Sequence, residues 1–181
     1  EYPSVIQLGG GVASTMAIGI FKYSDNGRYY WNLNPASSAS RYVGNTTFTV
    51  GAWNHLAYTF DSGAYKAYFN GVLFATDTIA EDVATLSTTT INGDTCIGLI
   101  GAEIGDRNDS MAAEVADARI FSSALSAEDI AILASKIRVD NSLLSASSDL
   151  LLQYKLDGTD ISSSTVDNAE DTAGRDGIIK E

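Results

Sequence analysis

The side chains of this sequence that could do acid and base chemistry include Glu114 and Asp117, two carboxylates three residues apart. A retaining glycoside hydrolase holds two carboxyl groups about 5–5.5 Å apart so that one protonates the leaving group while the other attacks. Side chains three residues apart on a strand point to opposite faces of the sheet. We therefore expect no acid and nucleophile pair at these positions.

Cys96 and His55 are the chain's single cysteine and single histidine. One cysteine excludes an intrachain disulfide framework, and one of each excludes a zinc cluster of cysteines and histidines. A Ser-His-Asp triad would have to use His55. The sequence also lacks a Gly-x-Ser-x-Gly elbow, a His-Glu-x-x-His motif and a phosphate-binding glycine loop. We therefore expect the chain not to be an enzyme.

The net charge and the hydrophobic content of the chain limit which kinds of partner it can bind. The formal net charge of −12 repels polyanions, so nucleic acid and anionic membranes are poor partners. No apolar run reaches the length of about 18 residues needed to span a membrane, so we expect no membrane insertion. With 181 residues, of which 45% are hydrophobic, the chain is long enough for one domain with its own core. It begins at Glu1 without a signal-like segment, and we expect it to be part of a longer chain or assembly.

Short strands separated by turn residues fill the chain from Met16 to Phe121, the pattern of an all-β sandwich or barrel. Asn26-Gly27 and Asn70-Gly71 each predict a tight hairpin, because these pairs accept the positive φ angles of such turns. Residues 51–60 read as a strand that leads into a turn at 61–63.

Residues 28–34 alternate between two faces. Tyr29, Trp31 and Leu33 share the face that we expect to be core. Arg28, Tyr30 and Asn32 share the other face, as in a sheet with one side toward water.

A single short helix is predicted over residues 126–137. Ser126 can cap the amide of Asp129, apolar residues follow at helical spacing, and Lys136 and Arg138 fall in the last turn. Residues 139–149 are serine-rich and linker-like, and residues 150–156 read as a last strand.

Two motifs carry a resemblance to a known family. They are Ala-Trp-Asn-His-Leu-Ala-Tyr-Thr-Phe-Asp at 52–61, followed by Ala-Tyr-Phe-Asn-Gly at 67–71, and Asp-Ala-Arg-Ile-Phe-Ser-Ser-Ala-Leu-Ser-Ala-Glu-Asp-Ile at 117–130. Together they resemble the laminin G-like, concanavalin A-like lectin/glucanase jelly-roll domains. The resemblance implies one antiparallel jelly-roll β-sandwich over residues 1–181, with 1–138 as its main body and Trp53 in its core.

A third similarity to the family occurs at an unexpected position along the chain. Residues 151–158 and 171–178 are similar to the opening strand and the following loop of that family, yet they come last here. Residues 150–181 are therefore either a permuted first strand of this domain or the start of a second copy.

The resemblance also implies calcium. It assigns Asp117 and Asp157 as ligands, with Asp171 as a weaker third, since calcium takes carboxylate oxygens from acidic loops. The alternative for Asp117 is a buried carboxylate paired with Arg119.

Glycan binding is the function that the family most often implies. A sugar stacks on an aromatic ring while polar side chains hold its hydroxyl groups. Our candidates are Tyr30, Arg28, Asn32 and Tyr42, against the alternative that these tyrosines are ordinary packing residues. The rival function is a structural or adhesion domain, or a decoration, that contacts protein in a larger surface or virion assembly. Either role would place the chain outside the cell, on a cell surface or on a virion.

Overall fold

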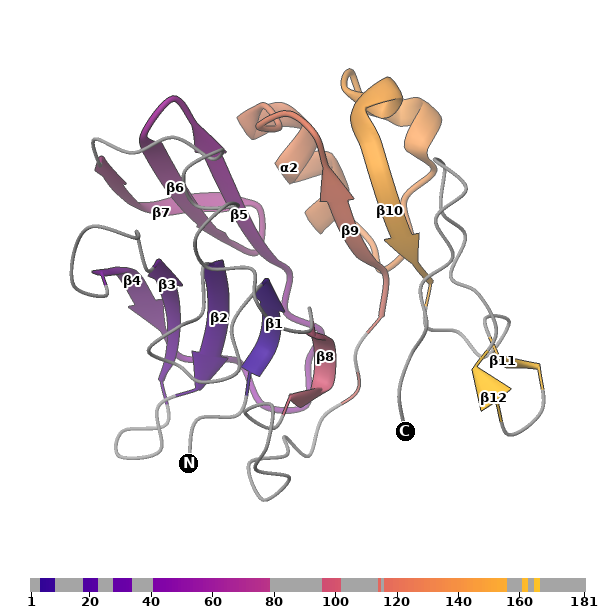
Figure 1. Ribbon diagram of the computed structural model, residues 1–181, viewed down its shortest axis with the longest axis horizontal. Coiled ribbons are helices and arrows are strands. Elements are labelled where there is room, and N and C mark those ends of the chain that lie inside the picture. The colour runs from indigo at the N-terminus through magenta and orange to yellow at the C-terminus, as the bar shows by residue number, and fades with distance from the viewer. Residues whose placement is uncertain are drawn as a thin grey trace. The chain divides into compact units, whose positions relative to one another are not determined.

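The computed structural model describes the chain as two compact units, Glu1–Glu114 (unit 1) and Val115–Glu181 (unit 2) (Figure 1). The residues that it describes are 4–8, 18–22, 28–33, 41–78, 96–101, 114, 116–155, 161–162 and 165–166.

Unit 1 contains a five-stranded sheet with the order β4-β3-β2-β1-β8, in which every neighbouring pair is antiparallel. Its strands are β1 (Ser4–Leu8), β2 (Ile18–Lys22), β3 (Tyr29–Leu33), β4 (Arg41–Thr46) and β8 (Cys96–Gly101). The hairpin of β2 and β3 confirms the pairing expected around Asn26-Gly27, whose own residues lie outside the described part. Sequence patterns had predicted neither β1 nor β4.

A three-stranded antiparallel meander completes the described part of unit 1. It consists of β5 (Leu56–Asp61), β6 (Ala64–Phe69) and β7 (Val72–Thr78). Both of its turns carry two residues with positive φ, 50° and 84° at Ser62-Gly63 and 50° and 80° at Asn70-Gly71. These are the angles of tight hairpin turns, so both turn predictions are confirmed.

The core of unit 1 lies between the two sheets and centres on Trp31, which is fully buried. The Trp31 indole Nε1 donates a hydrogen bond of 3.1 Å to the carbonyl oxygen of Ala57, and its ring meets that of Phe74 edge to face. Gly44, opposite Trp31 on β4, has no room for a side chain: a Cβ there would lie 2.7 Å from the Cβ of Ala75. The all-β antiparallel sandwich expected from the sequence is confirmed.

Trp53 does not belong to this core, so its expected position was wrong. Its side chain is 50% exposed, and β5 begins at Leu56 instead of at residue 51. The side chain of Asn54 closes the preceding residues into a turn, because its Oδ1 accepts from the Thr49 amide and its Nδ2 donates to the carbonyls of Thr49 and Ala52. That turn holds Trp53 outside the sheet.

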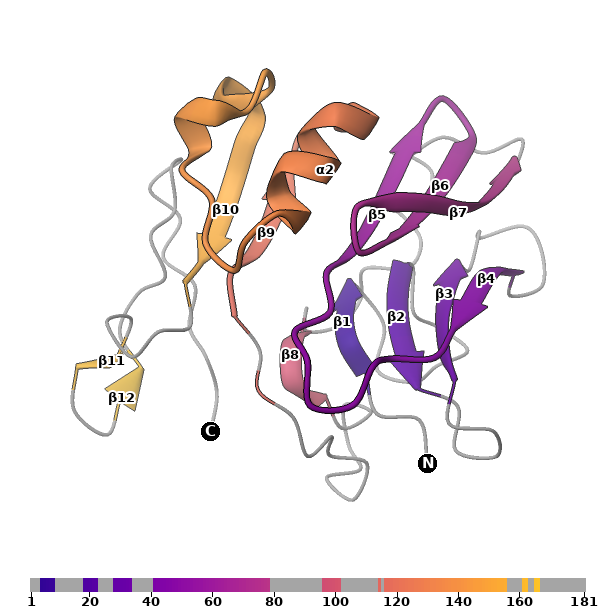
Figure 2. The same cartoon turned by 180° about the vertical axis from the view of Figure 1, so that it is seen from behind.

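Unit 2 contains β9 (Ala118–Phe121), α2 (Ala127–Ala134), the 3-10 turns η1 (Asn141–Leu143) and η2 (Ser147–Asp149), and β10 (Leu150–Tyr154). Antiparallel pairing joins β10 to β9 of the same chain, and α2 lies against one face of this pair (Figures 1 and 2). A two-residue ladder pairs β11 (Ile161–Ser162) with β12 (Thr165–Val166).

The helix begins as predicted but ends earlier. The Ser126 hydroxyl accepts from the Asp129 amide at 3.0 Å, which confirms the N-cap. The helix ends at Ala134, because the Ser135 hydroxyl and amide both turn back to the carbonyl of Ile132. Lys136 and Arg138 therefore lie beyond the helix and not in its last turn.

Residues 139–149 are folded and do not form a linker. Val139 and Leu144 are buried, and η1 and η2 occupy most of the remaining length. The serine-rich composition was misleading because serines hydrogen-bond in turns as well as in solvent.

Among the residues that the structure describes, no helix has the length and apolar character needed to cross a membrane.

The two tryptophans should respond differently to truncation. We expect Trp31→Ala to lower the free energy of unfolding by about 3–5 kcal/mol, because it opens a cavity between the sheets. Trp53→Ala is the matched control and should cost less than half as much, since half of that side chain is already in water. Urea unfolding of both variants measures this, and equal losses would contradict the position of Trp53.

The pairing of β10 with β9 predicts that residues after Asp149 stabilise this domain. A chain that ends at Asp149 should melt at a lower temperature than the full chain, because β9 loses its partner strand and the buried Leu150. A chain that ends at Leu156 retains β10 and is the matched control. If thermal unfolding by circular dichroism gave the full-length melting temperature for both, residues 150–181 would not complete this domain.

Candidate functional site

Strand β3 sends alternate residues to opposite faces, as its sequence pattern predicts. Tyr29 and Trp31 are buried in the core, and burial raises the pKa of the Tyr29 phenol above its usual range. Arg28 is exposed and Tyr30 half-buried. The expected division of β3 into a core face and an outer face is therefore confirmed for these four residues.

The outer face of β3 gains a polar partner from β4. Asn45 lies directly opposite Tyr30 in the register, and its Oδ1 accepts a hydrogen bond of 3.0 Å from Nη1 of Arg28. Directly opposite residues of an antiparallel pair have neighbouring side chains on one face. Arg28, Tyr30 and Asn45 therefore form one continuous group.

A bulge in β4 decides where Tyr42 falls. Trp31 pairs with Gly44, yet the next residue of β3, Asn32, pairs with Tyr42, so Val43 is the extra residue of the bulge. In an unbroken register Tyr42 would stand opposite Leu33, at a position of the core face. The bulge places it opposite Asn32 instead.

We call Arg28, Tyr30 and Asn45 the outer-face set. Of the four predicted glycan-binding residues, the structure joins Arg28 and Tyr30 with Asn45, and it pairs Asn32 with Tyr42 in the backbone register. Asn45 has no signal in the sequence, because only strand pairing shows which residue faces Tyr30. The set combines the Tyr30 phenol ring with the guanidinium of Arg28 and the amide of Asn45. Such groups can stack on a sugar and bind its hydroxyls. The set contains no carboxylate or histidine, the side chains that most often act as general acids and bases.

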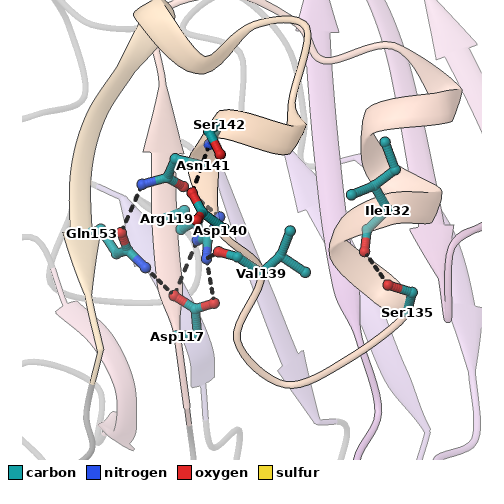
Figure 3. A network of polar contacts seen from close by, with 9 residues as sticks. All are labelled: Asp117, Arg119, Ile132, Ser135, Val139, Asp140, Asn141, Ser142 and Gln153. Carbon is teal, nitrogen blue, oxygen red and sulfur yellow. Dashed lines mark hydrogen bonds and ion pairs between the residues drawn. The ribbon is translucent and has the colours of Figure 1, made fainter.

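Asp117 lies in unit 2, where a ring of hydrogen bonds holds it (Figure 3). Its φ is 56°, and it is the residue before β9. Arg119 donates to both carboxylate oxygens, from Nε to Oδ1 at 3.0 Å and from Nη2 to Oδ2 at 2.7 Å. Nε2 of Gln153 donates to the same Oδ1 at 2.7 Å. The alternative role expected for Asp117, a buried partner of Arg119, is the one observed.

Calcium does not fit at Asp117 in this arrangement. Both carboxylate oxygens already accept hydrogen bonds, and the adjacent guanidinium neutralises the carboxylate charge that would attract a metal ion. Asp157 and Asp171 lie outside the described residues. Within the described ranges, no three side chains of histidine, cysteine, aspartate or glutamate come together in a way that could hold a metal.

Asp129 is a second buried carboxylate of unit 2, with 2% of its surface exposed. The Ser145 amide donates to its Oδ1 at 2.8 Å and the Ser145 hydroxyl to its Oδ2 at 2.5 Å. Burial by itself raises the pKa of Asp129, but the hydrogen bonds from Ser145, with further bonds involving Ser126 and Ala146, outweigh it and hold the pKa below its usual range. The ionised carboxylate thus ties α2 to the turn before η2.

Several large apolar side chains of unit 1 are exposed in the segment before β5 or at the start of β7. They are Val50 (98% exposed), Trp53, Val72 and Leu73. The His55 amide donates a hydrogen bond of 2.8 Å to Oδ1 of Asn70, and the Asn70 amide donates one of 2.8 Å to the His55 carbonyl. These bonds join the turn before β5 to the turn before β7. The backbone of His55 thus helps to hold these two turns together.

Comparison with known proteins gives one family and one structure. The family model described as the concanavalin A-like lectin/glucanases superfamily matches residues 4–131. The chain is also similar to the crystal structure of an S-layer domain-containing protein from Clostridium thermocellum, with 22% identity and a TM-score of 0.38. That alignment covers 74% of this chain and 63% of the other, so this chain spans less than two thirds of that structure's length. No curated protein matches.

The lowered pKa of Asp129 predicts acid sensitivity. A carboxylate with a depressed folded-state pKa stabilises the fold above its unfolded pKa of about 3.9, and this contribution disappears as the pH falls through the folded pKa. We expect Asp129→Asn to cost about 1.5–3 kcal/mol at pH 7, the range for hydrogen bonds to a charged group. The difference from wild type should shrink below about pH 4.

Urea unfolding at a series of pH values measures this difference. Glu128→Gln is the matched control, since it removes one exposed charge from the same helical turn without touching Ser145. A gap between wild type and Asp129→Asn that stayed constant down to pH 3 would contradict the assigned role of the ionised carboxylate.

Proposed function

Because the chain belongs to the concanavalin A-like lectin/glucanases superfamily, we propose that it is a non-catalytic recognition module that binds cell-surface or polymeric glycans through the outer-face set. The proposal places the module outside the cell, at a cell surface or on a virion, as part of a larger chain or assembly.

One observation carries this proposal: the pairing of β3 with β4 gathers Arg28, Tyr30 and Asn45 on the face of the sheet away from the core. An aromatic ring supplies an apolar surface for the C–H side of a sugar ring. Guanidinium and amide groups beside it offer both donors and an acceptor for hydroxyls. Because both strands belong to one hydrogen-bonded sheet, the backbone that carries these groups is already ordered before a ligand binds.

A second candidate is a structural or adhesion role in which the module contacts protein. It is favoured by exposed apolar side chains, those of Val50 and Trp53 before β5 and those of Val72 and Leu73 at the start of β7. Large apolar side chains are exposed more often at protein contact surfaces than elsewhere on a soluble protein. The two candidates use different parts of unit 1 and can be separated by substitution.

A glycan array probed with the full chain tests the first candidate. We expect binding to a related set of sugars, a loss of about tenfold or more for Tyr30→Ala, and a smaller loss for Arg28→Ala. Trp53→Ala is the matched aromatic control and Arg138→Ala the matched cationic control, and both should bind as wild type does.

Two results would contradict the proposal that the outer-face set binds glycans. Sugar binding that Trp53→Ala abolishes and Tyr30→Ala leaves intact would place the site elsewhere in unit 1. Absence of binding on a broad array, together with self-association or protein capture that depends on Trp53, would favour the second candidate.

A further inference from the structure

The guanidinium of Arg119 is enclosed by oxygen atoms from three parts of unit 2. It donates to Oδ1 and Oδ2 of Asp117, to Oδ1 of Asn141 at 2.6 Å, and to the carbonyl oxygen of Val139. Figure 3 shows these groups converging on it from the start of β9, from η1 and from the segment that precedes η1. We call these four oxygens the oxygen shell.

Gln153 of β10 holds the oxygen shell in this orientation. Its Nε2 donates to Oδ1 of Asp117 at 2.7 Å, while its Oε1 accepts from Nδ2 of Asn141 at 3.0 Å. One amide thus turns the carboxylate and the Asn141 carbonyl oxygen toward the guanidinium. The orientation of both shell residues is set by a strand that takes no part in the shell itself.

The arrangement is buried and contains one opposite charge for the cation. The Arg119 and Asp117 side chains are 4% and 7% exposed. A charge taken out of water in this way persists only when it is paired and its donors are satisfied. Carboxylate, amide and backbone carbonyl oxygens are also the ligands that hard metal cations prefer.

We propose that the oxygen shell is a cation site and that the chain's own Arg119 guanidinium is its cation. Unit 2 then folds around Asp117 without a metal ion. The disagreement with the calcium expected at Asp117 then has a physical cause. The oxygens surround a planar group with several N–H donors, whereas calcium would need them all within 2.3–2.6 Å of one point. The Arg119 guanidinium therefore fills the space inside the oxygen shell and donates hydrogen bonds to all four of its oxygens.

Removal and rescue of the cation test the proposal in the full chain. Arg119→Ala should lower the melting temperature by roughly 10 °C, because it leaves the Asp117 carboxylate buried and unpaired. Millimolar guanidinium should restore part of that loss, and calcium at the same concentration should not. Arg138→Ala, at an exposed arginine, is the matched control and should show neither the loss nor the rescue.

A second measurement does not depend on the folding of Arg119→Ala. We expect the difference in melting temperature between calcium and EDTA to be the same for wild type and for Asp117→Asn, which keeps the shape of the side chain. A calcium-induced rise in wild type that Asp117→Asn abolishes would overturn the proposal. Rescue of Arg119→Ala by calcium as effective as by guanidinium would also overturn it.

Discussion

The burial of Trp31 between the two sheets is the constraint on which unit 1 depends. Its indole N–H has one acceptor, the carbonyl of Ala57 on the facing sheet, and its ring meets the ring of Phe74, which lies where a side chain at Gly44 would be. Because side chains alternate along a strand, the burial of Trp31 in the core places Arg28 and Tyr30 on the opposite face of the sheet. The candidate binding surface is thus a consequence of core packing on the same strand.

Unit 2 is organised by charge as well as by apolar packing. The ion pair of Arg119 and Asp117 and the ionised Asp129 are buried, and each is satisfied by hydrogen bonds from segments distant in sequence. Buried charges are costly unless their geometry is complete. This requirement joins residues 139–155 to β9 and α2 at defined points, even though the composition of residues 139–149 resembles a flexible connection.

Membership of a superfamily that includes both lectins and glucanases defines the fold and leaves the activity open. Activity depends on which side chains are placed together. In unit 1 the outer-face set joins aromatic and polar groups suited to recognition, whereas in unit 2 the carboxylate of Asp117 is committed to Arg119. The first arrangement depends on the pairing of β3 with β4, and the second is completed by Gln153 of β10.

The sequence by itself determined features that depend on neighbouring residues: the two faces of β3, the turns at Ser62-Gly63 and Asn70-Gly71, and the Ser126 cap. These follow from backbone geometry over a few residues. Only the tertiary structure decided the exposure of Trp53, the position of Asn45 opposite Tyr30, and the oxygen shell around Arg119. Each of these depends on contacts between distant segments, including a one-residue bulge in β4, and such contacts leave no local pattern in the chain.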